Sequence, residues 1–133
     1  MGISLRAGRP AGPLPQDPNP QWSYSGFRLF RRTLAEHIGI DLAQMRRFGG
    51  TTDWASVASP LRHLLDHADD SGELAAWQAR ELAPALREAL AVLAREDADG
   101  LLWSLDSSNG RAAHNLVALL DLCAAEDLPV HIG

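Results

Sequence analysis

Most of the chain shows the three- and four-residue spacing of apolar side chains that is typical of amphipathic helices. The clearest example is the stripe from Phe27 to Ile38, which Gly39 follows at the position of a helix C-terminal cap. Similar stripes predict helices over residues 75–95 and 110–126. These patterns favour a mainly α fold, a single-domain bundle of four to five helices.

Serine and proline residues set several of the expected boundaries. Ser59 followed by Pro60 is a typical start of a helix, which here would run into the acidic stretch beyond it. Pro84 falls inside the long stripe that starts at Trp77, and it should kink or split that helix. The apolar run at residues 101–105 fits a short strand or a helical turn, and the alternation at residues 130–132 fits a brief terminal strand, so the bundle can include one or two very short strands.

The first 21 residues differ from the rest of the chain. They contain five of the eight prolines and three glycines, and they show no helical stripe. Proline lacks the N–H group that helices and β-ladders require. This composition therefore predicts a disordered, Pro/Gly-rich arm over residues 1–21 and a helical domain over residues 22–133.

Charge is distributed unevenly along the chain. All twelve basic residues are arginine, and residues 1–47 carry a formal charge of +4 whereas residues 48–133 carry −9. The basic half can meet an anionic partner, or it can attract the acidic half within one fold.

The sequence also bears on where the protein is found. A single cysteine excludes an intramolecular disulfide, and no apolar run is long enough to cross a bilayer. We therefore expect a cytoplasmic protein without membrane contacts.

The densest group of chemically active side chains lies between residues 62 and 73. His63 and His67 are four residues apart, so a helix would place both imidazoles on one face, as helical zinc sites do. The run from His63 to His67 is similar to the inverted zinc-peptidase motif, with Asp66 where that motif has Glu. A third ligand would come from Glu73, His114 or another acidic residue. The alternative is a solvated helix end. The candidate metal-binding residues are His63, Asp66, His67, Asp69, Asp70 and Glu73.

The same segment has the layout of a calcium loop. Gly72 would be the turn glycine, with Asp69 and Ser71 at oxygen-ligand positions. His67 and Gln78 then occupy the first and last ligand positions, where calcium requires a hard oxygen and a bidentate Glu. The segment therefore predicts a structural connector that does not bind calcium tightly, and we expect no cofactor.

Residues 22–31 and 65–74 resemble a family of small uncharacterised bacterial proteins. Members of that family carry a Trp-Ser-Tyr-x-x-Phe opening and an acidic loop of the type His-Ser-Asp-Cys-Asp-Gly-Glu-Leu. In this chain Asp70 stands where the family has Cys, and Ser71 stands where it has the following Asp. The resemblance implies a common fold and no particular activity.

Residues 34–48 form a second candidate site. Their apolar and glycine positions match a helix-turn-helix unit, with Gly39 at the turn and a recognition helix over residues 41–47. Any two short helices joined by glycine show the same pattern, and the net charge of −5 opposes phosphate binding. The candidate contacts to base edges or phosphates are Gln44, Arg46 and Arg47.

The remaining reactive or aromatic residues do not form a specific catalytic set. Cys123 lies on the apolar face of the last helix, where cysteine is usually a small buried side chain. Trp54, in a polar loop, is the tryptophan that we expect to be exposed. We therefore expect a non-enzymatic protein-interaction or regulatory domain whose partner is another protein. DNA binding through residues 34–48 is the second hypothesis, and metal binding through residues 63–73 is the third.

Overall fold

The computed structural model describes residues 2–46, 48–66, 72–96 and 108–133. The strands are β1 (Gly2–Ala7), β2 (Gln21–Ser23), β3 (Gly72–Leu74) and β4 (Val130–Ile132). The helices are α1 (Tyr24–His37), α2 (Arg62–Leu65), α3 (Ala76–Glu96) and α4 (Ser108–Glu126), with 3₁₀ turns η1 (Leu42–Gln44) and η2 (Trp54–Ser56).

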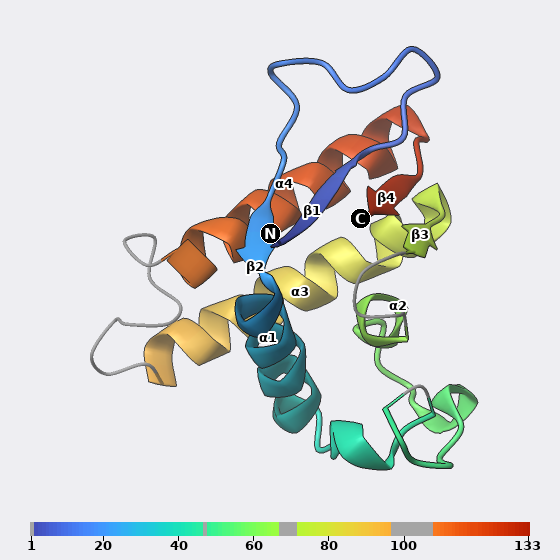
Figure 1. The fold of residues 1–133 in the computed structure, drawn as a ribbon, viewed down its shortest axis with the longest axis vertical. Coiled ribbons are helices and arrows are strands. Elements are labelled where there is room, and N and C mark those ends of the chain that lie inside the picture. The colour runs from blue at the N-terminus through green and yellow to red at the C-terminus, as the bar shows by residue number, and fades with distance from the viewer. Residues whose placement is uncertain (1, 47, 67–71, 97–107) are drawn as a thin grey trace.

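The strands form one sheet in the order β2-β1-β4-β3, and each neighbouring pair is antiparallel. Figure 1 shows β1 lying across α4, with α3 next to α4 and α1 leading away from β2. The prediction of a mainly α fold, a bundle of four to five helices, is therefore wrong, because helices and an antiparallel sheet share one fold. Three of the strands have only three residues, which is too short for an alternating pattern to be distinguished from a helical one.

β1 lies in the interior of the sheet, between β2 and β4. Its side chains alternate as a half-buried strand requires, with Ile3, Leu5 and Ala7 buried. The prediction of a disordered arm over residues 1–21 is therefore wrong for residues 2–7, which form β1. The prolines begin only at Pro10, behind the strand, so they do not interrupt its hydrogen bonds.

The proline-rich segment 8–20 is attached to the rest of the molecule by ion pairs. Arg9 donates to both carboxylate oxygens of Asp17, at 2.8 and 2.9 Å, and to both oxygens of Glu126, each at 3.1 Å. Asp17 also accepts a hydrogen bond from the Leu14 N–H. These three charged residues, the Arg9 clamp, connect this segment to the end of α4.

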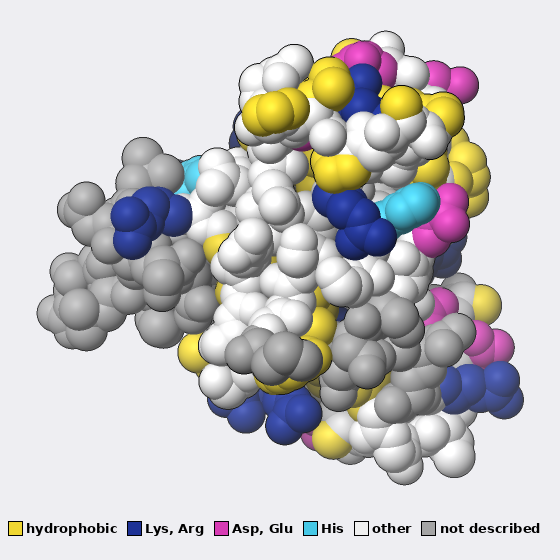
Figure 2. Space-filling model, turned by 45° about the horizontal axis from the view of Figure 1, so that its top comes forward, with side chains coloured by type: hydrophobic (Ala, Val, Ile, Leu, Met, Phe, Trp, Pro, Cys, Tyr) yellow, Lys and Arg dark blue, Asp and Glu magenta, His cyan; other side chains and the backbone are white. Residues whose placement is uncertain are grey.

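β4 lies between β1 and β3, so the short terminal strand expected at residues 130–132 is confirmed. The other candidate for a short strand, residues 101–105, lies outside the described residues. The register places Arg6, His131 and Glu73 next to one another on the outer face of the sheet. The His131 Nε2 atom is 4.0 Å from the Glu73 Oε2 atom. Figure 2 shows a basic, a histidine and an acidic side chain adjacent to one another, among mostly uncharged groups.

The long helices begin and end close to the positions that the sequence predicts. In α1 the Ser23 hydroxyl accepts from the Gly26 N–H at 3.0 Å, and Gly39 follows the helix with a φ of +78°. The Ile40 N–H then donates to the Ala35 carbonyl, which completes a Schellman cap. α3 runs through Pro84 without splitting.

The core lies between the inner face of the sheet and the helices. Within the described ranges, no helix combines the length and the apolar character that crossing a membrane requires. The helices contribute buried leucines at Leu34, Leu82, Leu86, Leu90, Leu116, Leu119 and Leu120.

Candidate functional site

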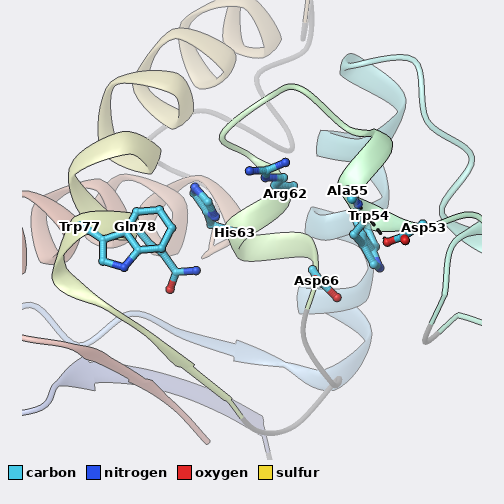
Figure 3. A pocket seen from close by; sticks show the side chains of 8 residues that line it. All are labelled: Asp53, Trp54, Ala55, Arg62, His63, Asp66, Trp77 and Gln78. Atoms are coloured by element: carbon cyan, nitrogen blue, oxygen red, sulfur yellow. Dashed lines mark hydrogen bonds between the residues drawn. The ribbon is translucent and has the colours of Figure 1, made fainter.

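A pocket of about 410 Å³ lies between α2, the turn η2 and the first turn of α3. Figure 3 shows His63 in its centre, with Trp77 on one side and Trp54 on the other. A volume of this order accepts a side chain or a small ligand. We call it the Trp77 pocket, and its lining residues are Asp53, Trp54, Ala55, Arg62, His63, Asp66, Trp77 and Gln78.

Arg31, a buried residue of α1, fixes the position of α2. Its Nη2 atom donates to the Leu65 carbonyl at 2.6 Å, and its guanidinium lies 4.8 Å from the centre of the Phe48 ring and 5.4 Å from that of Phe27. Leu65 is the last residue of α2, so its carbonyl has no partner within the helix and accepts from Arg31 instead. The charge distribution along the sequence counts Arg31 only as one basic residue of the first 47. Its position four residues after Phe27, on the apolar stripe, was the available signal.

His63 projects from α2 and is buried, with 6% of its surface exposed. Its Nε2 atom lies 2.8 Å from the Glu81 Oε1 atom on α3. Its ring meets the Trp77 ring edge-to-face, with centroids 5.3 Å apart and planes at 81°. The pair His63–Glu81 therefore connects α2 to α3, and the buried histidine is not at a solvated helix end.

The structure separates the residues of the predicted metal site. α2 ends at Leu65, and Asp66 already leaves the helical conformation with a ψ of 60°. Glu73 faces His131 on the sheet, whereas His63 contacts Glu81. His67, Asp69 and Asp70 lie outside the described residues. Among the residues that are described, no group of three histidine, cysteine or acidic side chains could hold a metal ion.

The exposed tryptophan of the pocket is Trp77, with 54% of its surface accessible, and not Trp54, with 5%. The expectation for Trp54 is wrong because its indole N–H donates to the Arg46 carbonyl at 2.9 Å and its ring packs against Phe48. Trp77 belongs to the apolar stripe that the sequence predicts over residues 75–95. It precedes Leu82 by five residues, a spacing that places it off that stripe.

A hydrogen bond at the start of α3 holds the backbone next to Trp77. The Gln78 side chain accepts from the Ala75 N–H at 2.8 Å, the arrangement of one half of a capping box. Trp77 therefore stands in a capped first turn and contacts His63, and Glu81 lies one turn further along the same face.

The recognition helix predicted over residues 41–47 is wrong. Only Leu42–Gln44 form a 3₁₀ turn, because the chain then folds back so that the Thr52 N–H donates to the Gln44 carbonyl at 3.0 Å. A Cβ atom at Gly50 would lie 2.0 Å from the same carbonyl oxygen, so this close return depends on glycine. Gln44 and Arg46 are exposed, and Arg47 lies outside the described residues.

Cys123 is buried in α4, as its position on the apolar face predicts. Burial raises the pKa of its thiol to about 11, so the nucleophilic thiolate is scarce at neutral pH.

Comparisons with known proteins supply no functional assignment for this chain. No protein-family model, no curated protein and no solved structure matches this chain. The resemblance to the family with the Trp-Ser-Tyr-x-x-Phe opening therefore stays a prediction.

Proposed function

We propose that the protein is a non-enzymatic interaction domain that binds a partner protein through the Trp77 pocket. The observation that carries this proposal is the exposure of Trp77, which is the most exposed large apolar side chain in the described part of the chain. It stands beside a pocket whose other walls are largely polar. An aromatic anchor with polar surroundings is the usual composition of an interface hot spot.

The fixed geometry of Trp77 supports the same function. Its ring contacts the buried His63, and the capped first turn of α3 holds its backbone. A side chain that is already ordered loses less conformational entropy when a partner binds, which increases the affinity that its buried surface provides.

The two alternative functions have less support. DNA binding through residues 34–48 stays a prediction. Its expected recognition helix over residues 41–47 is replaced by a 3₁₀ turn at Leu42–Gln44. Metal binding through residues 63–73 also stays a prediction. Among its candidate ligands, His63 is already paired with Glu81.

Co-purification from the source cell with matched variants tests this proposal. Trp77→Ala removes the anchor, and Tyr24→Ala removes an aromatic side chain of similar exposure on α1. We expect Trp77→Ala to lower the recovery of the partner by about tenfold or more, the effect of a hot-spot residue. We expect Tyr24→Ala to retain the parent's partner. Equal recovery with both variants, at parent-like melting temperatures, would overturn the proposal.

A further inference from the structure

A cavity of about 250 Å³ lies between β1 and the proline-rich segment 8–20. Figure 1 shows this segment as a loop that leaves the end of β1 and returns to β2. Arg6 of β1 lines the cavity, which we call the Arg6 pocket. Its apolar wall consists of Leu14 and three prolines, Pro13, Pro15 and Pro18. The volume lies below the usual range for drug-sized ligands, so the pocket suits a smaller organic molecule.

The charge of Arg6 is not matched by the protein. Within residues 2–46, 48–66, 72–96 and 108–133, its guanidinium makes no hydrogen bond and no ion pair. The residue is only partly exposed, and a guanidinium that is partly withdrawn from water is usually paired with an anion. Its N–H donors are therefore available to an anion that enters the pocket.

The acidic side chain that lines the same pocket, Asp17, is already neutralised. Its two carboxylate oxygens accept from Arg9 at 2.8 and 2.9 Å, and the Leu14 N–H adds a third hydrogen bond at 3.0 Å. The Asp17 side chain is only 4% exposed. Glu73, on the outer face of the sheet, lies 4.0 Å from His131 and forms no ion pair with Arg6. The unmatched charge of the described pocket is therefore that of Arg6.

The wall opposite Arg6 is held in place by its own hydrogen bonds. The Asp17 N–H donates to the Leu14 carbonyl at 3.1 Å, and the Arg9 clamp connects this turn to Glu126. Asn19 also lines the pocket, and its Oδ1 atom accepts from the Ser4 hydroxyl at 2.8 Å. The amide N–H groups of Asn19 are then a second set of donors for a ligand. A site that is ordered before binding loses less conformational entropy when the ligand enters.

We infer that the Arg6 pocket binds a small monocarboxylic acid with a short apolar chain. The carboxylate accepts two parallel hydrogen bonds from the Arg6 guanidinium, the geometry that this pair of groups favours. The apolar chain lies against Leu14 and the prolines, which a purely inorganic anion would leave uncovered. A carboxylate fits better than a phosphate dianion, because one unmatched cation balances one negative charge. This site is separate from the Trp77 pocket and does not depend on the function proposed there.

An NMR titration of the full chain at pH 7 tests the chemistry of the ligand. The probes are 4-methylpentanoate, its neutral amide, acetate and inorganic phosphate, and the readout is the backbone N–H resonances of residues 14 and 17 in the wall. We expect saturable shifts with 4-methylpentanoate and at least tenfold weaker binding of the amide, which keeps the shape and lacks the charge. Acetate lacks the apolar chain and should bind at least fivefold more weakly. Equal binding of the acid and its amide, or phosphate binding as tight as that of 4-methylpentanoate, would overturn the inference.

Matched variants test whether Arg6 and Leu14 form the site. Arg6→Gln should weaken the binding of 4-methylpentanoate about tenfold. Arg32→Gln removes the same charge from an exposed position of α1 and should change binding by less than twofold. Leu14→Ala should weaken 4-methylpentanoate at least threefold and leave acetate within twofold, because only the longer acid reaches that wall.

The expected variants keep the core intact, since Arg6 lies on the outer face of the sheet and Leu14 is 42% exposed. Parent-like melting temperatures check this. Equal effects of Arg6→Gln and Arg32→Gln would overturn the inference. If Arg6→Gln does not fold, the comparison of acid and amide on the parent protein decides the result.

Discussion

Glu81 connects α3 to α2 at the residue scale. Its Oε1 atom is the hydrogen-bond partner of the Nε2 atom of the buried His63. This hydrogen bond needs a suitable oxygen or nitrogen at that position and does not need a negative charge. Substitutions at this one position can therefore separate the contribution of the hydrogen bond from that of the charge.

Glu81→Ala should destabilise the protein more than Glu81→Gln. The alanine variant leaves the His63 Nε2 atom without its protein partner, at a cost of about 1 kcal/mol. Glutamine retains a polar group that can bond to the imidazole, so its free energy of unfolding should stay within about 0.5 kcal/mol of the parent. Urea unfolding measures both values, and equal losses in the two variants would show that the His63–Glu81 contact does not stabilise the fold.

Asp17 makes the Arg9 clamp sensitive to acid. Hydrogen bonds from Arg9 hold the pKa of Asp17 below its usual value. Its stabilising contribution is therefore present above the unfolded pKa of about 3.9 and disappears as the pH falls through the lower folded value. Asp17→Asn should lower the melting temperature at pH 7, and the difference from the parent should close toward pH 2. A difference that is constant with pH would contradict this assignment.

At the element scale, the helices α1, α3 and α4 and the terminal strand β4 could be predicted from the sequence, whereas β1, β2 and β3 could not. α1, α3 and α4 each repeat their apolar spacing over several turns, and local signals such as Ser23 and Gly39 mark the ends of α1. β1 shows three alternating apolar residues, but the prolines that follow dominated the composition of the segment. Strand pairing is also set by partners that are distant in the sequence, so a local pattern cannot supply it.

Removal of residues 1–20 tests whether β1 is part of the fold. Composition alone predicts no effect on the melting temperature, whereas the structure predicts the loss of cooperative unfolding, because an interior strand of the sheet disappears. Leu5→Ala should cost about 2–5 kcal/mol because the side chain is fully buried. Ser4→Ala, which changes the outer face, is the control and should cost less than about 1 kcal/mol. Parent-like melting of the truncated chain would contradict the sheet.

α2 ends at Leu65, and of the two histidines of the predicted metal site only His63 lies among the described residues. His63 is paired with Glu81, so zinc would have to disrupt an existing pair before it could bind. We expect micromolar zinc to shift the melting temperature by less than about 2 °C relative to EDTA. A shift above about 5 °C that disappears in His63→Ala would establish a metal site instead.

At the scale of the whole molecule, folding assembles the site from segments that show no shared motif. The pocket takes residues from η2, α2 and the first turn of α3. In the sequence, His63 and Asp66 are candidates for metal binding, whereas Trp77 belongs to an apolar stripe. The contact between His63 and Trp77 depends on how α2 packs against α3, which no local pattern shows. Arg9 and Glu126 pair across nearly the full length of the chain, which supports the alternative that the basic and acidic halves attract each other.

The central claim is that the surface around Trp77 contacts a partner protein. Site-specific photo-cross-linking in the source cell tests it most directly, with benzoylphenylalanine placed at position 55 and, as controls, at positions 24 and 88. Position 55 is exposed and lines the pocket, so Trp77 stays in place, whereas position 24 carries an exposed aromatic residue of α1 and position 88 an exposed residue of α3. We predict one discrete protein adduct from position 55 and none from the two controls. Adducts from position 24 or 88 with none from position 55 would contradict the claim.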